Sequence, residues 1–321
     1  MSQSSENSPL PGKPVQSYFQ WLYAFWKFSR PHTIIGTSLS VLGLYLIAIA
    51  INPTDSLLPT PHSLIPLLGA WIACLCGNVY IVGLNQLEDV EIDKINKPHL
   101  PLASGEFSQQ TGQLIVASTG ILALVVAWLT GPFLLGMVAI SLAIGTAYSL
   151  PPIRLKQFPV WAALCIFSVR GTIVNLGLYL HYSWALHQSQ TIPIVVWVLT
   201  LFILVFTFAI AIFKDIPDIE GDRLYNITTF TIKLGSQAVF NLSLWVITTC
   251  YLGIILVGVL RVASVNPIFL IVTHLALLAW LWLRSLTVDL EDKSAIAQFY
   301  QFIWKLFFME YLIFPIACLL A

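Results

Sequence analysis

Residues 107–153 read FSQQTGQLIVASTGILALVVAWLTGPFLLGMVAISLAIGTAYSLPPI and contain no Asp, Glu, Lys or Arg. A transmembrane helix needs about 20 predominantly apolar residues, so this stretch is long enough for two helices that meet at the helix breakers Gly131 and Pro132. The whole chain of 321 residues has a similar composition, with 58% hydrophobic and only 9% charged residues. Soluble domains carry about 25% charged residues. The sequence therefore predicts an integral membrane protein.

Seven further apolar stretches are long enough to cross a bilayer, which predicts nine transmembrane helices in an all-α, polytopic fold. These seven lie at residues 32–51, 63–84, 160–180, 192–213, 238–260, 267–283 and 299–320. Lys and Arg accumulate in cytoplasmic loops of membrane proteins. With the amino terminus on the cytoplasmic side, thirteen of the fifteen basic residues fall at the cytoplasmic ends of the nine spans. The count and the orientation therefore support each other.

The acidic residues are concentrated in two windows, EDVEID (88–93) and DIPDIEGD (215–222), which hold eight of the fifteen carboxylates. Each window follows the cytoplasmic end of a span, the second and the sixth, so both are expected on the same face of the membrane. Corresponding acids are 129 residues apart, which suggests two related halves. We expect a tail with an interfacial segment at 1–28 and a membrane domain at 29–321, with halves at about 29–150 and 158–285 and a final helix at 299–320.

Within the windows the acids recur at helical spacing. Asn85, Asp89 and Asp93 are separated by four residues each, which predicts one stripe on a helix that leaves the membrane. Asp218 and Asp222 repeat this spacing directly after Pro217, which is expected to end or kink the sixth span. Two facing stripes of like charge need a cation between them. Mg²⁺ prefers oxygen ligands and is commonly held by carboxylates together with substrate phosphates, so the pattern favours a diphosphate with an apolar tail as substrate.

Basic residues near these windows are candidates for binding the diphosphate, because Arg and Lys pair with phosphate oxygens. They are Lys94, Lys97, Lys214 and Arg223 beside the windows, and Arg154 and Lys156 in the loop after the fourth span. The same residues also satisfy the positive-inside rule, and both interpretations stay open. The basic excess typical of nucleic-acid binding is absent, because 15 Lys and Arg balance 15 Asp and Glu.

Five more polar residues, at three places in the chain, lead to a functional hypothesis. Arg170 lies within a predicted span with Asn175 about one turn away, and a charge inside the membrane is costly unless it has a function or a partner on a neighbouring helix. Glu310 in the aromatic last span raises the same question. Arg30 and His32, at the mouth of the first span, either contact a polar aromatic acceptor or lie at the membrane interface.

Several motifs resemble those of the UbiA-type intramembrane aromatic prenyltransferases, over nearly the whole chain after the tail. They are SRPHTIIGT (29–37), NQLEDVEIDKINKPHLPLASGEFS (85–108), YSLPPIRLK (148–156), FKDIPDIEGDR (213–223) and FYQFIWKLFFMEYL (299–312). Within that superfamily they look most like the homogentisate phytyltransferases of cyanobacteria and plastids. Gln86, where many members have Asp, fits this branch.

The resemblance implies nine helices around a central cavity that opens sideways to lipid and is capped on the cytosolic side by the acidic motifs. It implies transfer of a phytyl group from its diphosphate to homogentisate with decarboxylation, giving 2-methyl-6-phytylbenzoquinol for tocopherol synthesis, in a cyanobacterial plasma or thylakoid membrane. It further implies that Mg²⁺ is bound by Asn85, Asp89, Asp93, Asp218 and Asp222 with help from Asp215. Tyr148, Arg154 and Lys156 match the family's diphosphate-contacting loop.

Two alternatives remain at this stage. A homogentisate solanesyl- or geranylgeranyltransferase, or another prenyltransferase of quinone synthesis, would carry the same motifs. An ion-coupled transporter is a different class, and it is disfavoured because the carboxylates lie at one end of the spans rather than at the membrane midplane.

Overall fold

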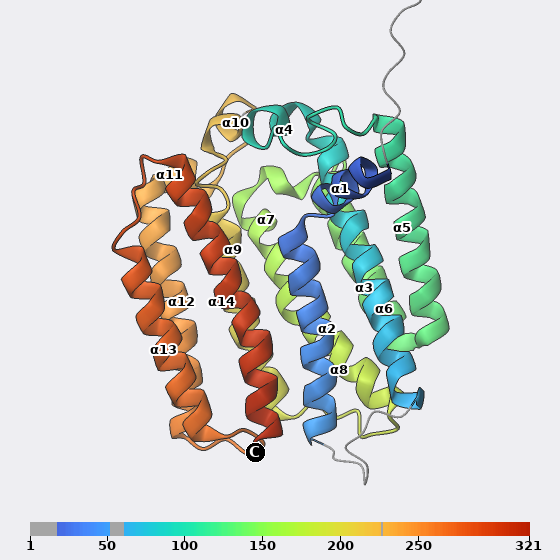
Figure 1. Ribbon diagram of the computed structural model, residues 1–321, viewed down its shortest axis with the longest axis vertical. Helices are drawn as coiled ribbons and strands as arrows, with labels where there is room; N and C mark the ends of the chain where they lie inside the picture. Colours follow the sequence, from blue (N-terminus) through green and yellow to red (C-terminus); the bar gives the residue numbers. More distant parts are fainter. Residues whose placement is uncertain (1–17, 52–60, 226) are drawn as a thin grey trace, which may run out of the picture.

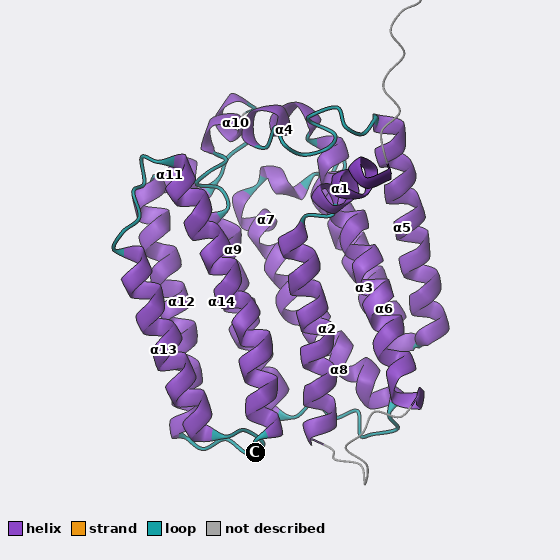
Figure 2. Ribbon diagram, in the orientation of Figure 1, coloured by secondary structure: helices purple, strands orange, loops and turns teal. Residues whose placement is uncertain are grey.

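A computed structural model of the chain describes residues 18–51, 61–225 and 227–321, so residues 1–17 of the expected tail lie outside the described part. The described residues form helices and loops without any strand (Figure 2). Nine helical segments in this part are long and apolar enough to cross a membrane, which confirms the predicted all-α membrane fold. They are α2 (Pro31–Ile51), α3 (Pro61–Glu88), α5 (Gln109–Thr130), α6 (Pro132–Ser149), the segment Pro159–Ala185, α9 (Ile194–Phe213), α12 (Ser236–Val259), α13 (Pro267–Ser285) and α14 (Lys293–Leu319).

The spans form a closed ring, because the first and last of them, α2 and α14, pack against each other. Going round the ring, α2 contacts α3, α3 contacts α6, α6 contacts the segment Pro159–Ala185, and that segment contacts α9, which reaches α14. Helix α5 packs outside α3 and α6, and α12 and α13 pack outside α9 and α14. Six spans therefore form the ring itself.

The expected break at Gly131 and Pro132 is present. Gly131 has φ 153°, ends α5 and precedes Pro132 at the first position of α6. A backbone angle in this region favours glycine, and proline suits the first helical turn because its missing N–H would be unpaired there. The charge-free stretch therefore folds back on itself as two antiparallel spans.

The fifth span differs from the predicted 160–180 in length and regularity. It consists of α7 (Pro159–Phe167), a π-helical turn η2 (Ser168–Ile173) and α8 (Val174–Ala185). It continues past residue 180 because the polar groups there find partners inside the protein, with the Tyr182 hydroxyl donating to the carbonyl of Val41 at 3.1 Å. A π-turn within a helix is rare and often lies at a functional site.

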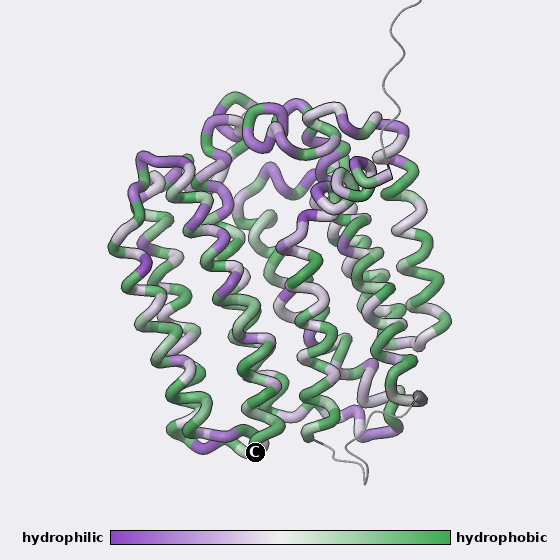
Figure 3. Tube along the Cα trace, in the orientation of Figure 1, coloured by the Kyte–Doolittle hydropathy of each residue, from purple (hydrophilic) through white to green (hydrophobic). Residues whose placement is uncertain are grey.

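Short helices close one end of the ring. Helices α4 (Val90–Asn96) and α10 (Ile219–Leu224) lie side by side across this end, near α1 (Tyr18–Phe28), and the carboxy terminus lies at the opposite end (Figure 1). Also in this region are the 3-10 turn η1 (Leu155–Gln157) and α11 (Phe230–Leu234). Hydrophilic residues gather in this cap, whereas the helices below it are predominantly hydrophobic (Figure 3).

Candidate active site

The first acidic window does not form the continuous helix that the i, i+4, i+8 spacing predicts. Helix α3 ends at Glu88, and Asp89 has φ −113° and ψ 16°, outside the helical region, before α4 begins at Val90. The expected single stripe is therefore wrong. The break allows α4 to turn across the end of the ring rather than continue along the axis of the span (Figure 1).

The second window has the same local design. Helix α9 ends at Phe213, four residues before Pro217, because proline has no N–H to donate to the carbonyl of Phe213. Asp218 then stands immediately before α10, as Asp89 stands before α4. In both cases the backbone oxygen of the first aspartate accepts a hydrogen bond from the second, from Asp93 N at 2.7 Å and from Asp222 N at 3.1 Å.

The segments that carry the two windows meet directly, as the prediction that both emerge on one face requires. The backbone N–H of Gly221 in α10 donates to Oδ1 of Asn96 in α4 at 3.0 Å, and Lys97 Nζ lies 2.5 Å from Asp218 Oδ2. A Cβ atom on Gly221 would lie only 2.4 Å from Asn96 Oδ1. The absence of a side chain at this position is therefore what allows α4 and α10 to approach so closely.

Beneath this junction the ring encloses a cavity of about 1590 Å³. The amide and carboxylates expected at the metal site all line it: Asn85, Asp89, Asp93, Asp215, Asp218 and Asp222. Gln86 does not line it, because its Nε2 donates to the carbonyl of Phe28 at 2.7 Å and so ties α3 to the end of α1. The acidic end of the cavity is thus built from the ends of α3 and α9 and from the two short cap helices.

The predicted diphosphate-binding residues divide into three groups. Lys97, Tyr148, Lys156 and Lys214 line the cavity. Arg154 does not line it but approaches Asp89, with Nη2 at 3.2 Å from Oδ1, and Lys156 Nζ lies 2.6 Å from the same oxygen. Lys94 and Arg223 are exposed and lie away from the cavity, and Lys94 pairs with Glu91 at 2.6 Å.

Burial and the repulsion between neighbouring carboxylates raise the pKa values of acids at this end of the cavity. Burial raises the pKa of Asp222 to about 7, and the nearby carboxylate of Asp218 adds to this shift. Burial also raises the pKa of Asp93, with Asp89 and Asp218 contributing in the same direction and Arg30 and Lys97 opposing it. Burial lowers the pKa of the Lys156 ammonium, although Asp89 beside it works in the opposite direction. Acids from both windows therefore act on one another electrostatically.

The donor set fits a hard divalent cation that takes some of its ligands from the protein and the others from a bound substrate. Among the described residues, no three His, Cys, Asp or Glu side chains are arranged to hold an ion by themselves, whereas Asp93 Oδ2 is buried without a hydrogen-bond partner in that part of the chain. Mg²⁺ is usually bound by one or two carboxylates together with substrate phosphates and water. The combination of several carboxylates with lysines around one cavity end matches that mode of binding.

Aromatic residues of α14 form a second wall that the sequence-based search for charged motifs missed. Tyr300, Trp304, Phe307 and Tyr311 all line the cavity. Their spacing of four, three and four residues is the signal that could have identified them, because it places them on one face of a helix. Cavity-lining Arg284 and Lys305 were also missed as site residues.

Three of the four residues proposed for an aromatic acceptor line the cavity beside this wall. Arg30 and His32 line the cavity, and the His32 ring lies 4.8 Å from that of Trp304. Arg170 also lines it. Asn175 lies behind the wall, where its Oδ1 accepts a hydrogen bond from the Tyr311 hydroxyl at 2.7 Å.

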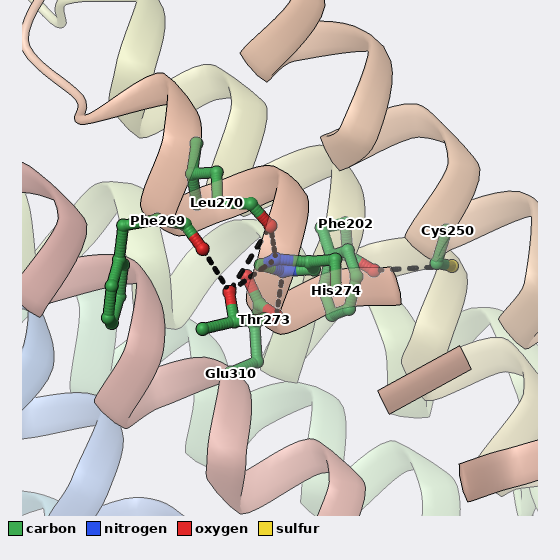
Figure 4. Close-up of polar contacts among 7 residues, drawn as sticks. All are labelled: Phe202, Cys250, Phe269, Leu270, Thr273, His274 and Glu310. Atoms are coloured by element: carbon green, nitrogen blue, oxygen red, sulfur yellow. Dashed lines mark hydrogen bonds and ion pairs between the residues drawn. The ribbon is translucent and has the colours of Figure 1, made fainter. Parts of the chain in front are cut away.

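Glu310 faces away from the cavity and pairs with a histidine of the neighbouring span. Its Oε2 lies 3.0 Å from His274 Nε2, and both side chains are completely buried (Figure 4). His274 Nδ1 donates to the carbonyl of Leu270 at 2.8 Å, since a carbonyl oxygen can only accept. This pair joins α13 to α14, which supports a structural role for Glu310.

We expect Glu310→Ala to destabilise the protein by roughly 1–3 kcal/mol, because it leaves the buried His274 nitrogen without its partner. Glu310→Gln retains a group able to form a hydrogen bond and should cost less. The apparent melting temperature in detergent measures both effects, with exposed Glu291→Ala as control. Equal melting temperatures for Glu310→Ala and the wild type would contradict the structural role.

Comparison with known proteins agrees with the fold. The model of the UbiA prenyltransferase family matches residues 41–306, and the chain belongs to this family. It is 56% identical over 296 residues to a homogentisate phytyltransferase from Synechocystis sp., covering 92% of this chain and 96% of that protein. It is 38% identical over 300 residues to the chloroplastic homogentisate solanesyltransferase of Arabidopsis thaliana, covering 91% and 76% of the two chains.

A solved structure supports the same fold. The UbiA homologue from Archaeoglobus fulgidus, bound to GPP and Mg²⁺, aligns with a TM-score of 0.61 and 16% identity over 93% of this chain and all of that one. Membership of a prenyltransferase family favours the enzyme over the transporter considered above.

Proposed function

We propose that this protein transfers a phytyl group from phytyl diphosphate to homogentisate with loss of carbon dioxide, giving 2-methyl-6-phytylbenzoquinol in tocopherol synthesis. The observation that carries the reaction type is the junction of two acidic windows and several lysines at one end of a large cavity in a ring of membrane spans. The polar end suits a diphosphate, and the apolar remainder suits a prenyl chain.

Identity to relatives supports the choice of acceptor and chain. The chain is 56% identical over 296 residues to the phytyltransferase from Synechocystis but 38% identical over 300 residues to the solanesyltransferase from Arabidopsis. We therefore place phytyl first, with solanesyl or geranylgeranyl as the alternative. Because the Synechocystis relative is cyanobacterial, we propose a cyanobacterial plasma or thylakoid membrane as the location. The positions of the basic residues support an orientation with the amino terminus and the acidic cap on the cytoplasmic side.

We propose Mg²⁺ as the cofactor, held by Asn85, Asp89, Asp93, Asp218 and Asp222 with Asp215 beside them. The chemistry that bound Mg²⁺ supplies is neutralisation of charge on the departing diphosphate. Lys97, Lys156 and Lys214 line the same end of the cavity and would bind the diphosphate oxygens as charge develops on them.

The remaining walls serve the other half of the reaction. An allylic carbon that loses diphosphate becomes cationic and reacts with water unless water is excluded. The rings of Tyr300, Trp304 and Phe307 line the cavity, and aromatic faces attract a cation by about 0.5–2 kcal/mol each. These residues would hold the prenyl carbon in an apolar environment until the aromatic ring attacks it.

The test is a transfer assay with purified protein, Mg²⁺ and homogentisate, in which phytyl, geranylgeranyl and solanesyl diphosphates are supplied separately. We expect 2-methyl-6-phytylbenzoquinol, detected by mass spectrometry, together with diphosphate and carbon dioxide in equal amounts. Reactions with EDTA or without homogentisate serve as controls. Faster use of solanesyl diphosphate would favour the alternative, and absence of any prenylated product would refute the proposal.

Metal affinity should depend on pH, because carboxylates must lose their protons to bind a cation. The pKa of Asp222 is raised to about 7, so below this pH the cation competes with a proton, and above it the carboxylate is free. We expect Mn²⁺, followed by electron paramagnetic resonance in place of Mg²⁺, to bind more tightly at pH 8 than at pH 6. The Asp222→Asn variant should show a weaker dependence, and equal affinity of the wild type at both values would contradict the shift.

A further inference from the structure

Arg170 lies at an unusual point of the fifth span. It belongs to the π-turn η2, eleven residues after the start of the span at Pro159. A helix rises about 1.5 Å per residue, so Arg170 lies roughly 16 Å along the helix from the end that carries the acidic cap. Its guanidinium lies beside Gly36, five residues after the start of α2, and none of the cap carboxylates pairs with it.

The guanidinium has aromatic neighbours but no acidic one. Its central carbon lies 5.1 Å from the ring centre of Trp304 and 5.6 Å from that of Phe307. Within the described residues, no Asp or Glu lies within ion-pair distance of Arg170. The nearby acid Glu310 on α14 is engaged with His274 instead. A cation at this depth without a counter-charge is costly, although aromatic faces offset part of that cost.

The surroundings of Arg170 fix the π-turn and make room for its guanidinium. Asn175 Nδ2 donates to the carbonyl of Gly171 at 2.6 Å, and Asn175 Oδ1 accepts from the Tyr311 hydroxyl at 2.7 Å. These two bonds connect the π-turn to the aromatic wall on α14. On α2, a Cβ atom at Gly36 would lie 3.2 Å from Arg170 Nη1, so glycine there keeps room for the guanidinium.

We propose that Arg170 binds the carboxylate of the aromatic acceptor, which for homogentisate is its acetate group, and so selects acceptors that carry one. The inference rests on the proposed function. Arg170 lines the same cavity as the acids of the cap, so an acceptor carboxylate on Arg170 and a prenyl diphosphate at the cap would share one space. A guanidinium can form two parallel hydrogen bonds with a carboxylate, which would give the site both charge balance and orientation.

The first experiment needs only the wild type. Its kcat/KM is measured for homogentisate and for 2,5-dihydroxytoluene, which has the same ring hydroxyls but no carboxylate, both with phytyl diphosphate. We expect homogentisate to be preferred by about 10- to 100-fold, the range of a charge-assisted hydrogen-bonded pair. Transfer to neither compound would refute the proposed function itself, whereas equal use of both would overturn the role of Arg170 alone.

The second experiment compares Arg170→Gln and Arg170→Lys. In Arg170→Gln the KM for homogentisate should rise about 10- to 100-fold while the KM for phytyl diphosphate stays within about twofold, and the preference for the carboxylate should disappear. Arg170→Lys keeps the charge without the planar fork and should recover part of the loss. Exposed Arg261→Gln, in the loop after α12, is the matched control.

A merely structural role for Arg170 would give a different result. It would lower kcat for both acceptors alike and reduce the apparent melting temperature, with no change in the ratio of the two kcat/KM values. A rise in the KM for phytyl diphosphate instead would mean that Arg170 binds diphosphate, and that outcome also overturns the proposal. If Arg170→Gln does not fold, Arg170→Lys decides, because it should raise the KM for homogentisate and leave the KM for phytyl diphosphate unchanged.

Discussion

Asp218→Asn is expected to lower kcat/KM for prenyl transfer by about 10²–10³-fold, and Asp89→Asn by a similar factor. Each variant keeps the shape of the side chain but removes a carboxylate that lines the acidic end of the cavity. The effect should be large because these acids hold both the proposed cation and the lysines around it. Asp218 lies 2.5 Å from Lys97, and Asp89 lies 2.6 Å from Lys156.

The controls come from the same two windows. Glu91, two residues from Asp89, is exposed and does not line the cavity, and Glu220, two residues from Asp218, is also exposed. Glu91→Gln and Glu220→Gln should therefore retain nearly full activity. Size-exclusion chromatography and melting curves in detergent show whether the variants remain folded. Near wild-type turnover in a folded Asp218→Asn or Asp89→Asn variant would refute the assignment of the cation site.

The number of spans could be predicted from composition because a bilayer imposes a length on every helix that crosses it. The meeting of the acidic windows followed from the same count, since four spans between them return the chain to one face. The spacing of Asn85, Asp89 and Asp93 could not reveal the break at Asp89. A helix that stops and restarts keeps similar spacing in sequence, and only the packing of α4 against α10 distinguishes the two cases.

Helix geometry also explains which flanking lysines and arginines reach the cavity. Lys94 and Arg223 directly follow Asp93 and Asp222 in short helices, and one residue along a helix turns a side chain by about 100°. They therefore point away from the acids that line the cavity. Lys97 is four residues after Asp93, which returns it to the same face, and it pairs with Asp218. Judged only by their proximity to the acids in sequence, Lys94, Lys97 and Arg223 are equivalent candidates.

Gly171→Ala is expected to destabilise the protein by about 1–3 kcal/mol or more. Gly171 lies in the π-turn beside Arg170, where η2 packs against α9. An added Cβ would lie 2.5 Å from Leu204 Cα and 2.9 Å from Leu204 N. Because these are backbone atoms inside a helix, neither can move aside as a flexible side chain would, and α9 itself would have to shift.

The matched control is Gly136→Ala, on the exposed surface of α6, where an added Cβ would have no atom within 4 Å. Alanine in a helix is favoured over glycine by about 0.5–1 kcal/mol. The Gly136→Ala variant should therefore melt at or above the wild-type temperature, whereas Gly171→Ala should melt several degrees below it. Gly171 directly follows Arg170 and accepts a hydrogen bond from Asn175 through its carbonyl. A shift of α9 against this turn should therefore also displace Arg170 and raise the KM for homogentisate. A Gly171→Ala variant with an unchanged melting temperature and KM would mean that the approach of α9 to the π-turn is not what holds Arg170 in the cavity wall.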